Sequence, residues 1–237
     1  MKIEVWSDFV CPYCFLGKRN LELALEKFAH KENVRIKYRS FQLNDPQDNE
    51  GEIYVTEALS KKYGMPKKQI NLMNEQLQKQ GKEAGITLNF EKLLHIQTSD
   101  VHRIVKHAES LGQSKDLIND LFEEYFTNNK NISEEETLIP LAVKAGMEEA
   151  EAKRVFETCK YGRSVKEDIE LAREFNVQGV PFFVINEKYA VPGAQAVDAF
   201  IEILESIWEQ EGSVFGQTDE GINNTNYCHG DACERNS

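Results

Sequence analysis

The sequence predicts an α/β fold whose strands fall into two groups, one on each side of a long helical segment. The first group belongs to a β-α-β unit in residues 1–45, and the second to an α-β-β-α unit in residues 162–210. Between them, apolar residues recur only at helical spacing. Cys11 and Cys14 stand where the first strand passes into the first helix. We therefore expect a core built from both ends of the sequence and organised around this cysteine pair.

The β-α-β unit follows from three patterns. Residues 3–6 are a short apolar strand candidate, and apolar residues then recur at helical spacing in a helix that begins at Cys14 and reaches Phe28. Residues 34–43 alternate at period two, which predicts a second strand. Asn44-Asp45-Pro46 is expected to end it.

The middle segment predicts a series of helices and no strand. Helical spacing appears in the ranges 56–64, 67–84, 99–111, 117–126 and 148–159. Gly112 is expected to end the helix before it. Ser133-Glu134-Glu135-Glu136 has the form of a capping box and predicts the start of a further helix, with Pro140 inside it.

The last unit predicts a helix, a hairpin and a closing helix. The helix covers residues 165–175, and the hairpin joins a strand at 177–186 to one at 189–191. Apolar spacing predicts the closing helix at 197–208. From Glu211 the composition shifts to small and polar residues, which predicts a mobile tail.

Charge and cysteine content narrow the function classes. The net charge is −12 and no basic patch is visible, which argues against a nucleic-acid partner or an anionic membrane surface. No apolar run approaches the about 20 residues needed to span a bilayer. The N-terminus shows no signal-peptide pattern, so a cytoplasmic location is expected. In that compartment the 5 cysteines favour catalysis or metal binding over a structural disulfide framework.

A Cys-x-x-Cys turn between a strand and a helix is the usual setting of a redox dithiol. The first turn of the helix has unpaired N–H groups and a partial positive charge, which stabilise a thiolate at Cys11. Pro12 suits this turn, because the N–H that proline lacks is not needed there. Cys14 is close enough to close a disulfide with Cys11. We expect Cys11 to attack and Cys14 to resolve, with a half-built metal site as the alternative.

Two stretches of the sequence resemble a known family. The first runs from Ser7 through the cysteine pair to Gly17, and the second from Gly179 to Gln195. Together they resemble the thioredoxin fold with a helical insertion, as in the DsbA family. The FrnE-like cytoplasmic branch of that family is the most similar, and it is related to kappa-class glutathione transferases and 2-hydroxychromene-2-carboxylate isomerases.

The resemblance covers about residues 1–210 and implies a division of the chain. A discontinuous thioredoxin-like core would comprise residues 1–45 and 162–210, interrupted by an all-helical insertion at 46–161. Residues 211–237 would form a flexible tail.

The resemblance also implies a role for Pro181. In the family the proline after Gly-Val is cis and packs opposite the cysteine pair, so Pro181 is expected to be cis. The backbone of Val180 would then be free to pair with an extended substrate segment beside Cys11. From the residues alone, Pro181 is instead typical of the first residue of a strand, where the N–H that proline lacks is not needed for hydrogen bonding to the neighbouring strand.

Further substrate contacts are expected from Pro12, Tyr13 and His102. The Pro-Tyr dipeptide between the cysteines resembles that of glutaredoxins, which leaves glutathione open as a co-substrate. The stretch from Thr98 to Arg103 resembles a family stretch on an insertion helix that faces the active site. His102 is therefore expected to orient substrate or to polarise the Cys11 thiolate, and the alternative is a histidine bonded within the helical block.

The tail carries a second cysteine pair, Cys228 and Cys233. A dithiol tethered to the same chain has a high effective concentration at Cys11 and Cys14. We therefore expect an internal relay, in which the tail pair exchanges electrons with the first pair by thiol–disulfide exchange. One alternative is a zinc site made by the four thiols, with His229 in reserve, and another is a tail without function. Cys159, near the end of a predicted helix, is expected to be a small buried hydrophobe.

The predicted function is thiol–disulfide oxidoreduction, of the reductase or isomerase type, on protein or small-molecule disulfides. No metal or organic cofactor is expected, apart from glutathione as an open co-substrate. Two alternatives come from other classes. One is a glutathione-dependent isomerase or transferase, and the other is a zinc- or redox-controlled binding module.

Overall fold

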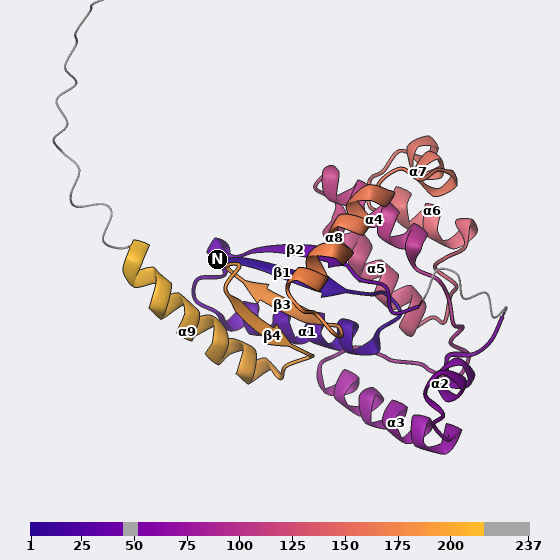
Figure 1. Ribbon diagram of the computed structural model, residues 1–237, viewed down its shortest axis with the longest axis horizontal. Helices are drawn as coiled ribbons and strands as arrows, with labels where there is room; N and C mark the ends of the chain where they lie inside the picture. Colours follow the sequence, from indigo (N-terminus) through magenta and orange to yellow (C-terminus); the bar gives the residue numbers. More distant parts are fainter. Residues whose placement is uncertain (45–51, 216–237) are drawn as a thin grey trace, which may run out of the picture.

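The computed structural model of the chain describes residues 1–44 and 52–215. Within these residues four strands form one mixed sheet in the order β2-β1-β3-β4. The strands are β1 (Lys2–Ser7), β2 (Arg35–Ser40), β3 (Phe182–Ile185) and β4 (Tyr189–Pro192). Strand β1 pairs in parallel with β2 and antiparallel with β3, which pairs antiparallel with β4. Strands from residues 2–40 and from residues 182–192 therefore meet in one sheet (Figure 1), and the predicted α/β fold is confirmed.

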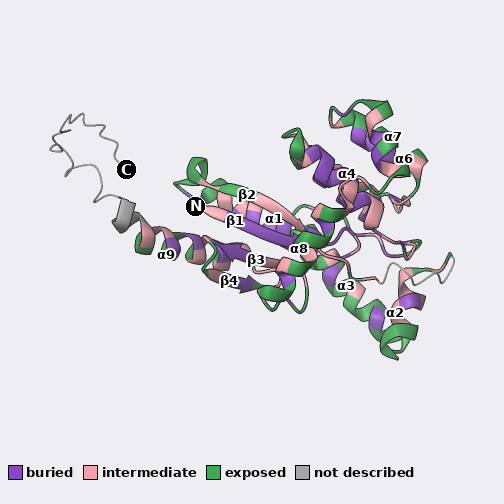
Figure 2. Ribbon diagram, turned by 45° about the horizontal axis from the view of Figure 1, so that its top comes forward, coloured by how far each residue is buried: buried purple, intermediate pink, exposed green. Residues whose placement is uncertain are grey.

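Helices cover the two faces of this sheet. On one face, Ile3 and Val5 of β1 pack against Leu21 of α1 (Pro12–Lys27) and Phe200 of α9 (Val197–Phe215). On the other face, Trp6 packs against α8 (Gly162–Glu174). Alternate residues of a strand point to opposite faces, so the central strand β1 is buried on both (Figure 2).

The remaining helices lie toward one end of the sheet, where the first two form a pair apart from the other four (Figure 1). They are α2 (Val55–Tyr63), α3 (Lys67–Glu83), α4 (Ser99–Ser110), α5 (Ser114–Phe126), α6 (Glu135–Lys144) and α7 (Glu149–Glu157). Phe122 and Phe126 of α5 are fully buried at the centre of this group. The same apolar cluster includes Phe15, Cys11 and Cys14, so the cysteine pair lies at the junction of the sheet and the helical group.

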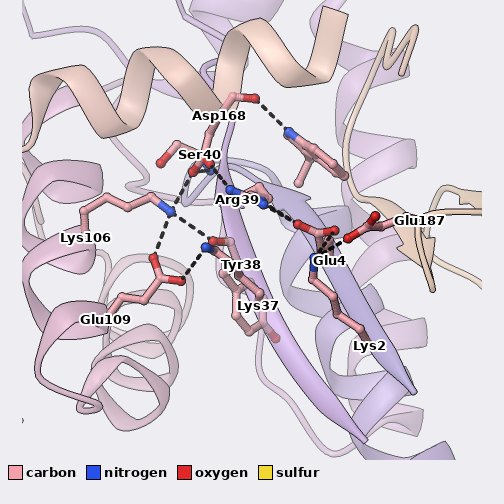
Figure 3. Close-up of polar contacts among 11 residues, drawn as sticks. Lys2, Glu4, Lys37, Tyr38, Arg39, Ser40, Lys106, Glu109, Asp168 and Glu187 are labelled. Carbon is pink, nitrogen blue, oxygen red and sulfur yellow. Dashed lines mark hydrogen bonds and ion pairs between the residues drawn. The ribbon is translucent and has the colours of Figure 1, made fainter. Parts of the chain in front are cut away.

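A chain of buried ion pairs fastens this helical group to the sheet on its α8 face (Figure 3). Asp168 of α8 accepts from Lys106 of α4 at 2.6 Å and from Arg39 of β2 at 2.8 Å. Arg39 also pairs with Glu4 of β1, which lies 3.0 Å from the ammonium group of Lys2. Each buried charge therefore has a partner of opposite sign, as burial of ionised groups requires.

Several predicted elements differ from the structure at their ends. Helix α1 begins at Pro12 with Cys11 as its N-cap, two residues earlier than the predicted start. The strand predicted from residue 177 begins only at Phe182. The capping box at Ser133 does not form. Glu134 is the N-cap of α6, because the Ser133 hydroxyl donates to Asn131 instead.

The structure corrects the expectation for Cys159 and leaves the predicted domain boundaries untested. Cys159 is exposed after the end of α7, so the prediction of a buried thiol was wrong. The boundaries of the predicted core, insertion and tail stay predictions. Of the helices that the structure describes, none combines the length and the apolar character needed to cross a bilayer.

Candidate active site

The loop between β1 and α1 presents the cysteine pair. The backbone N–H of Cys11 donates to the carbonyl of Asp8 at 3.1 Å, and that of Cys14 donates to the carbonyl of Cys11 at 3.0 Å. These bonds turn the chain sharply into the helix, with Pro12 in its first turn. Cys11 therefore occupies the helix N-terminus, where the unpaired N–H groups favour an anion.

The two sulfurs have different surroundings. Both cysteines are free thiols, and Cys14 is the more deeply buried, with 1% of its surface exposed. Burial raises the pKa of Cys14 well above the ordinary value, and the hydrogen bond and charge of Cys11 raise it further. Hydrogen bonds from the Ser7 side chain and the Asp8 backbone lower this pKa in part. Cys14 is thus held as a thiol.

A proline loop lies directly opposite the cysteine pair. The Val180–Pro181 peptide bond is cis, as the family resemblance implied. The Cys11 thiol donates to the Val180 carbonyl at 3.4 Å. This contact places the backbone of Val180 beside Cys11. Because Val180 is half-buried, the contact lies at the edge of the site.

Gly17 allows α1 to approach this loop closely. A Cβ atom at Gly17 would lie 3.0 Å from Cγ of Pro181 and 3.3 Å from Ala194. One turn further along α1, the Asn20 amide donates to the carbonyl of Gln195 at 2.8 Å. The stretch from Pro181 to Gln195 is therefore fixed on α1 beside the dithiol.

His102 lies under the site, on α4. It is buried, and its Nε2 is 3.3 Å from Oδ1 of Asp8. Its ring also lies against that of Phe9, with the centroids 5.2 Å apart. The side chain has only 3% of its surface exposed, and its partner Asp8 belongs to the loop before Cys11 and not to the helical block. The role of His102 in orienting substrate or polarising the Cys11 thiolate stays a prediction.

The other predicted substrate residues lie at the surface around Cys11. Tyr13 is 42% exposed, and Pro12 is half-buried. Their contact with substrate stays a prediction. Cys228 and Cys233 lie outside the described residues, so the relay and the four-thiol zinc site stay predictions too. In residues 1–44 and 52–215, no three side chains of His, Cys, Asp or Glu gather in a way that could hold a metal ion.

Two further residues of the site were not predicted from the sequence. Asp8 is fully buried and bonds to His102, and hydrogen bonding by the Ser7 side chain lowers the pKa of Cys14 in part. An acidic residue in a short apolar loop before a Cys-x-x-Cys pair was the available signal for Asp8. Its partner could not be found from spacing, because 93 residues separate Asp8 from His102 along the chain.

The sheet order, the cysteine pair at the start of α1 and the cis-proline opposite it define a protein of the thioredoxin-fold class with a large helical insertion. The family model described as the DSBA-like thioredoxin domain matches residues 2–205, so the chain belongs to that family.

Individual relatives agree with this assignment. The uncharacterised protein YwbO of Bacillus subtilis is 26% identical over 200 residues, covering 84% of this chain and 92% of YwbO. The crystal structure of the probable DsbA oxidoreductase SCO1869 from Streptomyces coelicolor matches with a TM-score of 0.85 and 29% identity, over 100% of both chains. The cytosolic disulfide reductase DsbM from Pseudomonas aeruginosa shares the fold at 15% identity, with a TM-score of 0.64 over 89% of this chain and 100% of DsbM.

Proposed function

We propose that this protein is a thiol–disulfide oxidoreductase of the reductase or isomerase type, acting on protein or small-molecule disulfides. One observation carries the proposal. Cys11 stands at a helix N-terminus beside the Val180 carbonyl, with the buried thiol of Cys14 one turn away. A cysteine at a helix N-terminus, followed one turn later by a more deeply buried thiol, is the arrangement that thiol–disulfide exchange needs.

The reaction proceeds in two exchanges. The Cys11 thiolate attacks one sulfur of the substrate disulfide, the substrate S–S bond breaks, and the released sulfur leaves as a thiolate that takes a proton from solvent. Cys14 then loses its proton and attacks the sulfur of Cys11. The mixed disulfide breaks, the second substrate sulfur leaves, and a Cys11–Cys14 disulfide forms. The substrate gains two electrons and the protein loses two.

The surface around Cys11 suits an extended substrate segment. The backbone of Val180 lies beside the attacking sulfur, and Pro181 is fixed on α1 by the close approach at Gly17. Pro12 and Tyr13 follow Cys11 directly in the dithiol turn, and Tyr13 is exposed. In this proposal Val180 and Pro181 align the substrate, and Tyr13 and Pro12 contact its side chains.

A thiol reductant must return the protein to its dithiol form. Two molecules of glutathione would supply the two electrons, and DsbM, which shares the fold, has been solved with glutathione. The cytosolic location of DsbM likewise supports the proposed cytoplasmic location of this protein. No metal or further organic cofactor takes part in the proposed reaction.

The tail pair Cys228 and Cys233 would be a second electron donor or acceptor. Helix α9 starts near Gln195, which binds α1 beside the dithiol, and at 19 residues it runs for about 28 Å. The chain from Phe215 to Cys228 spans at most about 45 Å when extended. That reach is sufficient for the tail to return along α9 to Cys11.

Disulfide reduction of insulin by the purified protein, with glutathione as reductant, tests the proposal. Activity is expected to vanish in Cys11→Ser and to persist in Cys159→Ser, a matched control whose thiol is exposed and remote from the dithiol motif. Cys14→Ser is expected to accumulate a mixed disulfide at Cys11, visible by mass spectrometry. Full activity of Cys11→Ser would reject the proposed function.

The same trapped variant tests the relay. In Cys14→Ser under oxidising conditions, a disulfide between Cys11 and either tail cysteine is expected. If no such adduct accumulates, the relay is excluded while the oxidoreductase proposal stands.

A glutathione-dependent isomerase or transferase is the second candidate. Its support is the fold shared with 2-hydroxychromene-2-carboxylate isomerase, at 14% identity and a TM-score of 0.66. Such an enzyme would keep its activity with glutathione in Cys14→Ser and would not reduce insulin. The two assays therefore separate the candidates.

A further inference from the structure

Strand β2 forms one edge of the sheet. In the part of the chain that the structure describes, β1 is the only strand that pairs with it. The N–H of Arg35 donates to the Met1 carbonyl at 2.9 Å, and the N–H of Phe41 donates to the Ser7 carbonyl at 3.1 Å. Because alternate residues of a strand bond to the same side, the odd-numbered residues of β2 face β1. Residues 36, 38 and 40 therefore direct their N–H and C=O groups away from β1.

Side chains of α4 and α8 cover one half of this outer edge (Figure 3). The Ser40 N–H donates to the Asp168 carboxylate at 2.8 Å, and the Tyr38 carbonyl accepts from the Lys106 ammonium at 3.2 Å. Lys106 and Asp168 also pair with each other, and together they take the place of a neighbouring strand. Toward the start of β2 the edge is open, and Ile36 is 38% exposed.

Hollows border the open half of β2 on both faces of the sheet. One hollow, of about 940 Å³, is lined in part by Arg35 and Lys37. The other, of about 620 Å³, is lined in part by Ile36, Tyr38 and Leu25 of α1. The side chains of an added strand alternate between the two faces, so each set has space. Outward main-chain groups flanked by side-chain pockets are the features that an extended peptide uses when it joins a sheet.

The side chains of the open half decide which strand fits there. Arg35 and Lys37 share the face of β2 that α8 covers further along, and Ile36 and Tyr38 share the α1 face. The Lys37 ammonium is 3.7 Å from Glu109, and the Arg35 guanidinium donates to backbone carbonyls, so both cations can bind a further carboxylate. Oppositely charged side chains directly across a strand pair stabilise it. The open half of β2 therefore fits a strand in which acidic side chains alternate with apolar ones.

A second copy of β2 does not meet this requirement. The outward groups of two antiparallel copies bond only in registers that set odd-numbered residues opposite odd-numbered residues. Those residues are Arg35, Lys37 and Arg39, so every such register sets cations directly across from cations. Like charges in that position destabilise a strand pair. The charges of this edge thus favour a partner with a different sequence.

We propose that residues 35–38 of β2 form a docking edge for an extended segment of a partner protein, in which acidic and apolar side chains alternate. Arg35 is in register with Lys2 at the start of β1, whereas the dithiol follows the end of β1. The docking edge is therefore separate from the proposed substrate site, and the inference goes beyond the proposed function without depending on it. At physiological salt, charges more than about 8 Å apart are largely screened, so the nearby cations outweigh the net charge of −12.

Fluorescence anisotropy of a labelled octapeptide tests the proposal with the full-length protein. In the probe peptide glutamate alternates with valine. A peptide of the same composition, with all glutamates before all valines, is the control. We expect saturable binding of the alternating peptide and binding of the control that is at least about tenfold weaker, because only the alternating peptide sets each glutamate on the face of Arg35 and Lys37.

Charge reversal tests the predicted pairs across the strands. The double variant Arg35→Glu, Lys37→Glu is expected to bind the glutamate peptide about tenfold more weakly and to gain affinity for a peptide in which lysine alternates with valine. Arg163→Glu combined with Lys166→Glu is the matched control, because both residues are exposed on α8 and line neither hollow. Unchanged binding after reversal at Arg35 and Lys37, or an equal loss in the control variant, overturns the proposal.

Amide hydrogen exchange, followed by nuclear magnetic resonance, tests whether the peptide adds as a strand. The bound peptide is expected to slow exchange severalfold at the outward N–H groups of Ile36 and Tyr38. Exchange at Lys37, whose N–H faces β1, is expected to change much less. Ile36→Pro removes an outward donor without breaking a bond to β1, so it is expected to abolish binding and to leave the fold intact.

The remaining outcomes are equally decisive. Exchange at Ile36 in the free protein as slow as that at Lys37 overturns the proposal, because residues 216–237 or a second copy would then occupy the edge. Failure of the alternating peptide to bind, or binding without slower exchange at Ile36 and Tyr38, overturns it too. Insulin reduction by the same protein does not depend on these results, so the proposed function is judged separately.

Discussion

Lys106 of α4 and Asp168 of α8 form a buried ion pair 2.6 Å long. Asp168 also pairs with Arg39 of β2 and accepts the backbone N–H of Ser40, so the contact joins the helical insertion to the sheet (Figure 3). Burial alone would raise the pKa of Asp168. The charge and hydrogen bond of Lys106, with the bonds from Ser40 and Arg39, outweigh burial and lower the pKa overall.

Asp168→Asn removes this countercharge from the buried Lys106 and the half-buried Arg39. Breaking a buried pair in this way is expected to lower the free energy of unfolding at pH 7 by about 3 kcal/mol. Urea denaturation monitored by circular dichroism measures the change. Asp120→Asn is the control, because Asp120 pairs with the exposed Lys144 and its loss is expected to leave the urea midpoint nearly unchanged. Equal losses in the two variants would contradict a special role for the buried pair.

The same carboxylate predicts a pH dependence of stability. Because the pKa of Asp168 is lower in the folded state, its contribution is complete above the ordinary value of about 3.9. The contribution is lost as the pH falls through the folded-state pKa. The wild-type protein should therefore lose more stability than Asp168→Asn between about pH 4 and pH 2. Parallel stability curves in that range would exclude this contribution.

Gly17→Ala tests the close approach of α1 to the proline loop. The added Cβ would lie 3.0 Å from Pro181 and 3.3 Å from Ala194, so the loop must move. We expect a loss of about 1–3 kcal/mol in stability, together with reduced insulin reductase activity. Gly162→Ala is the matched helical control, since its nearest neighbour would be 4.0 Å away. The expectation fails if both variants keep full activity and stability.

Thiol labelling tests the difference between the two cysteines. The raised pKa of Cys14 means that it holds its proton at pH 7, and burial shields it further. Iodoacetamide is expected to label Cys11 first at pH 7, and Cys14 only as the pH rises above the ordinary thiol value of about 8.5. Peptide mass spectrometry over time measures both, with the exposed Cys159 as internal reference. Equal labelling rates at pH 7 would contradict the assignment of roles.

Tyr13→Ala tests the predicted substrate contact. Tyr13 is 42% exposed between the two cysteines, so its removal is expected to raise the KM for insulin severalfold and to leave the Tm unchanged. Tyr63→Ala on α2 is the control, because that side chain is 60% exposed and outside the dithiol motif. An unchanged KM in Tyr13→Ala would remove Tyr13 from the proposed substrate site.

The fold and the dithiol could be predicted from the sequence because their signals are local. Cys11, Pro12 and Cys14 lie within one helical turn, and periodicity marks the strand before them. The family resemblance supplied the cis bond at Pro181, which no local pattern of apolar residues indicates. The start of β3 was placed too early, because apolar residues before Pro181 continue the strand pattern while the chain still turns.

The polar contacts under the site could not be predicted, because they join residues that are distant in sequence. The buried pair of Asp8 and His102 crosses from the β1–α1 loop to α4. The pairs of Asp168 with Lys106 and Arg39 join three separate elements. A charged residue in an amphipathic helix is usually solvated, so its sequence position does not reveal that the fold buries it.

The pairing of β1 has a consequence for folding during synthesis. Its partner on one edge, β2, follows early in synthesis, whereas its partner on the other edge, β3, leaves the ribosome only after the whole helical segment. Until then one edge of β1 has no strand to pair with, and unpaired edges invite association between chains. A nascent or truncated chain that ends before Val180 would also carry Cys11 and Cys14 without the proline loop opposite them. Synthesis of the proline loop and the last two strands therefore both completes the sheet and places a loop opposite Cys11 and Cys14.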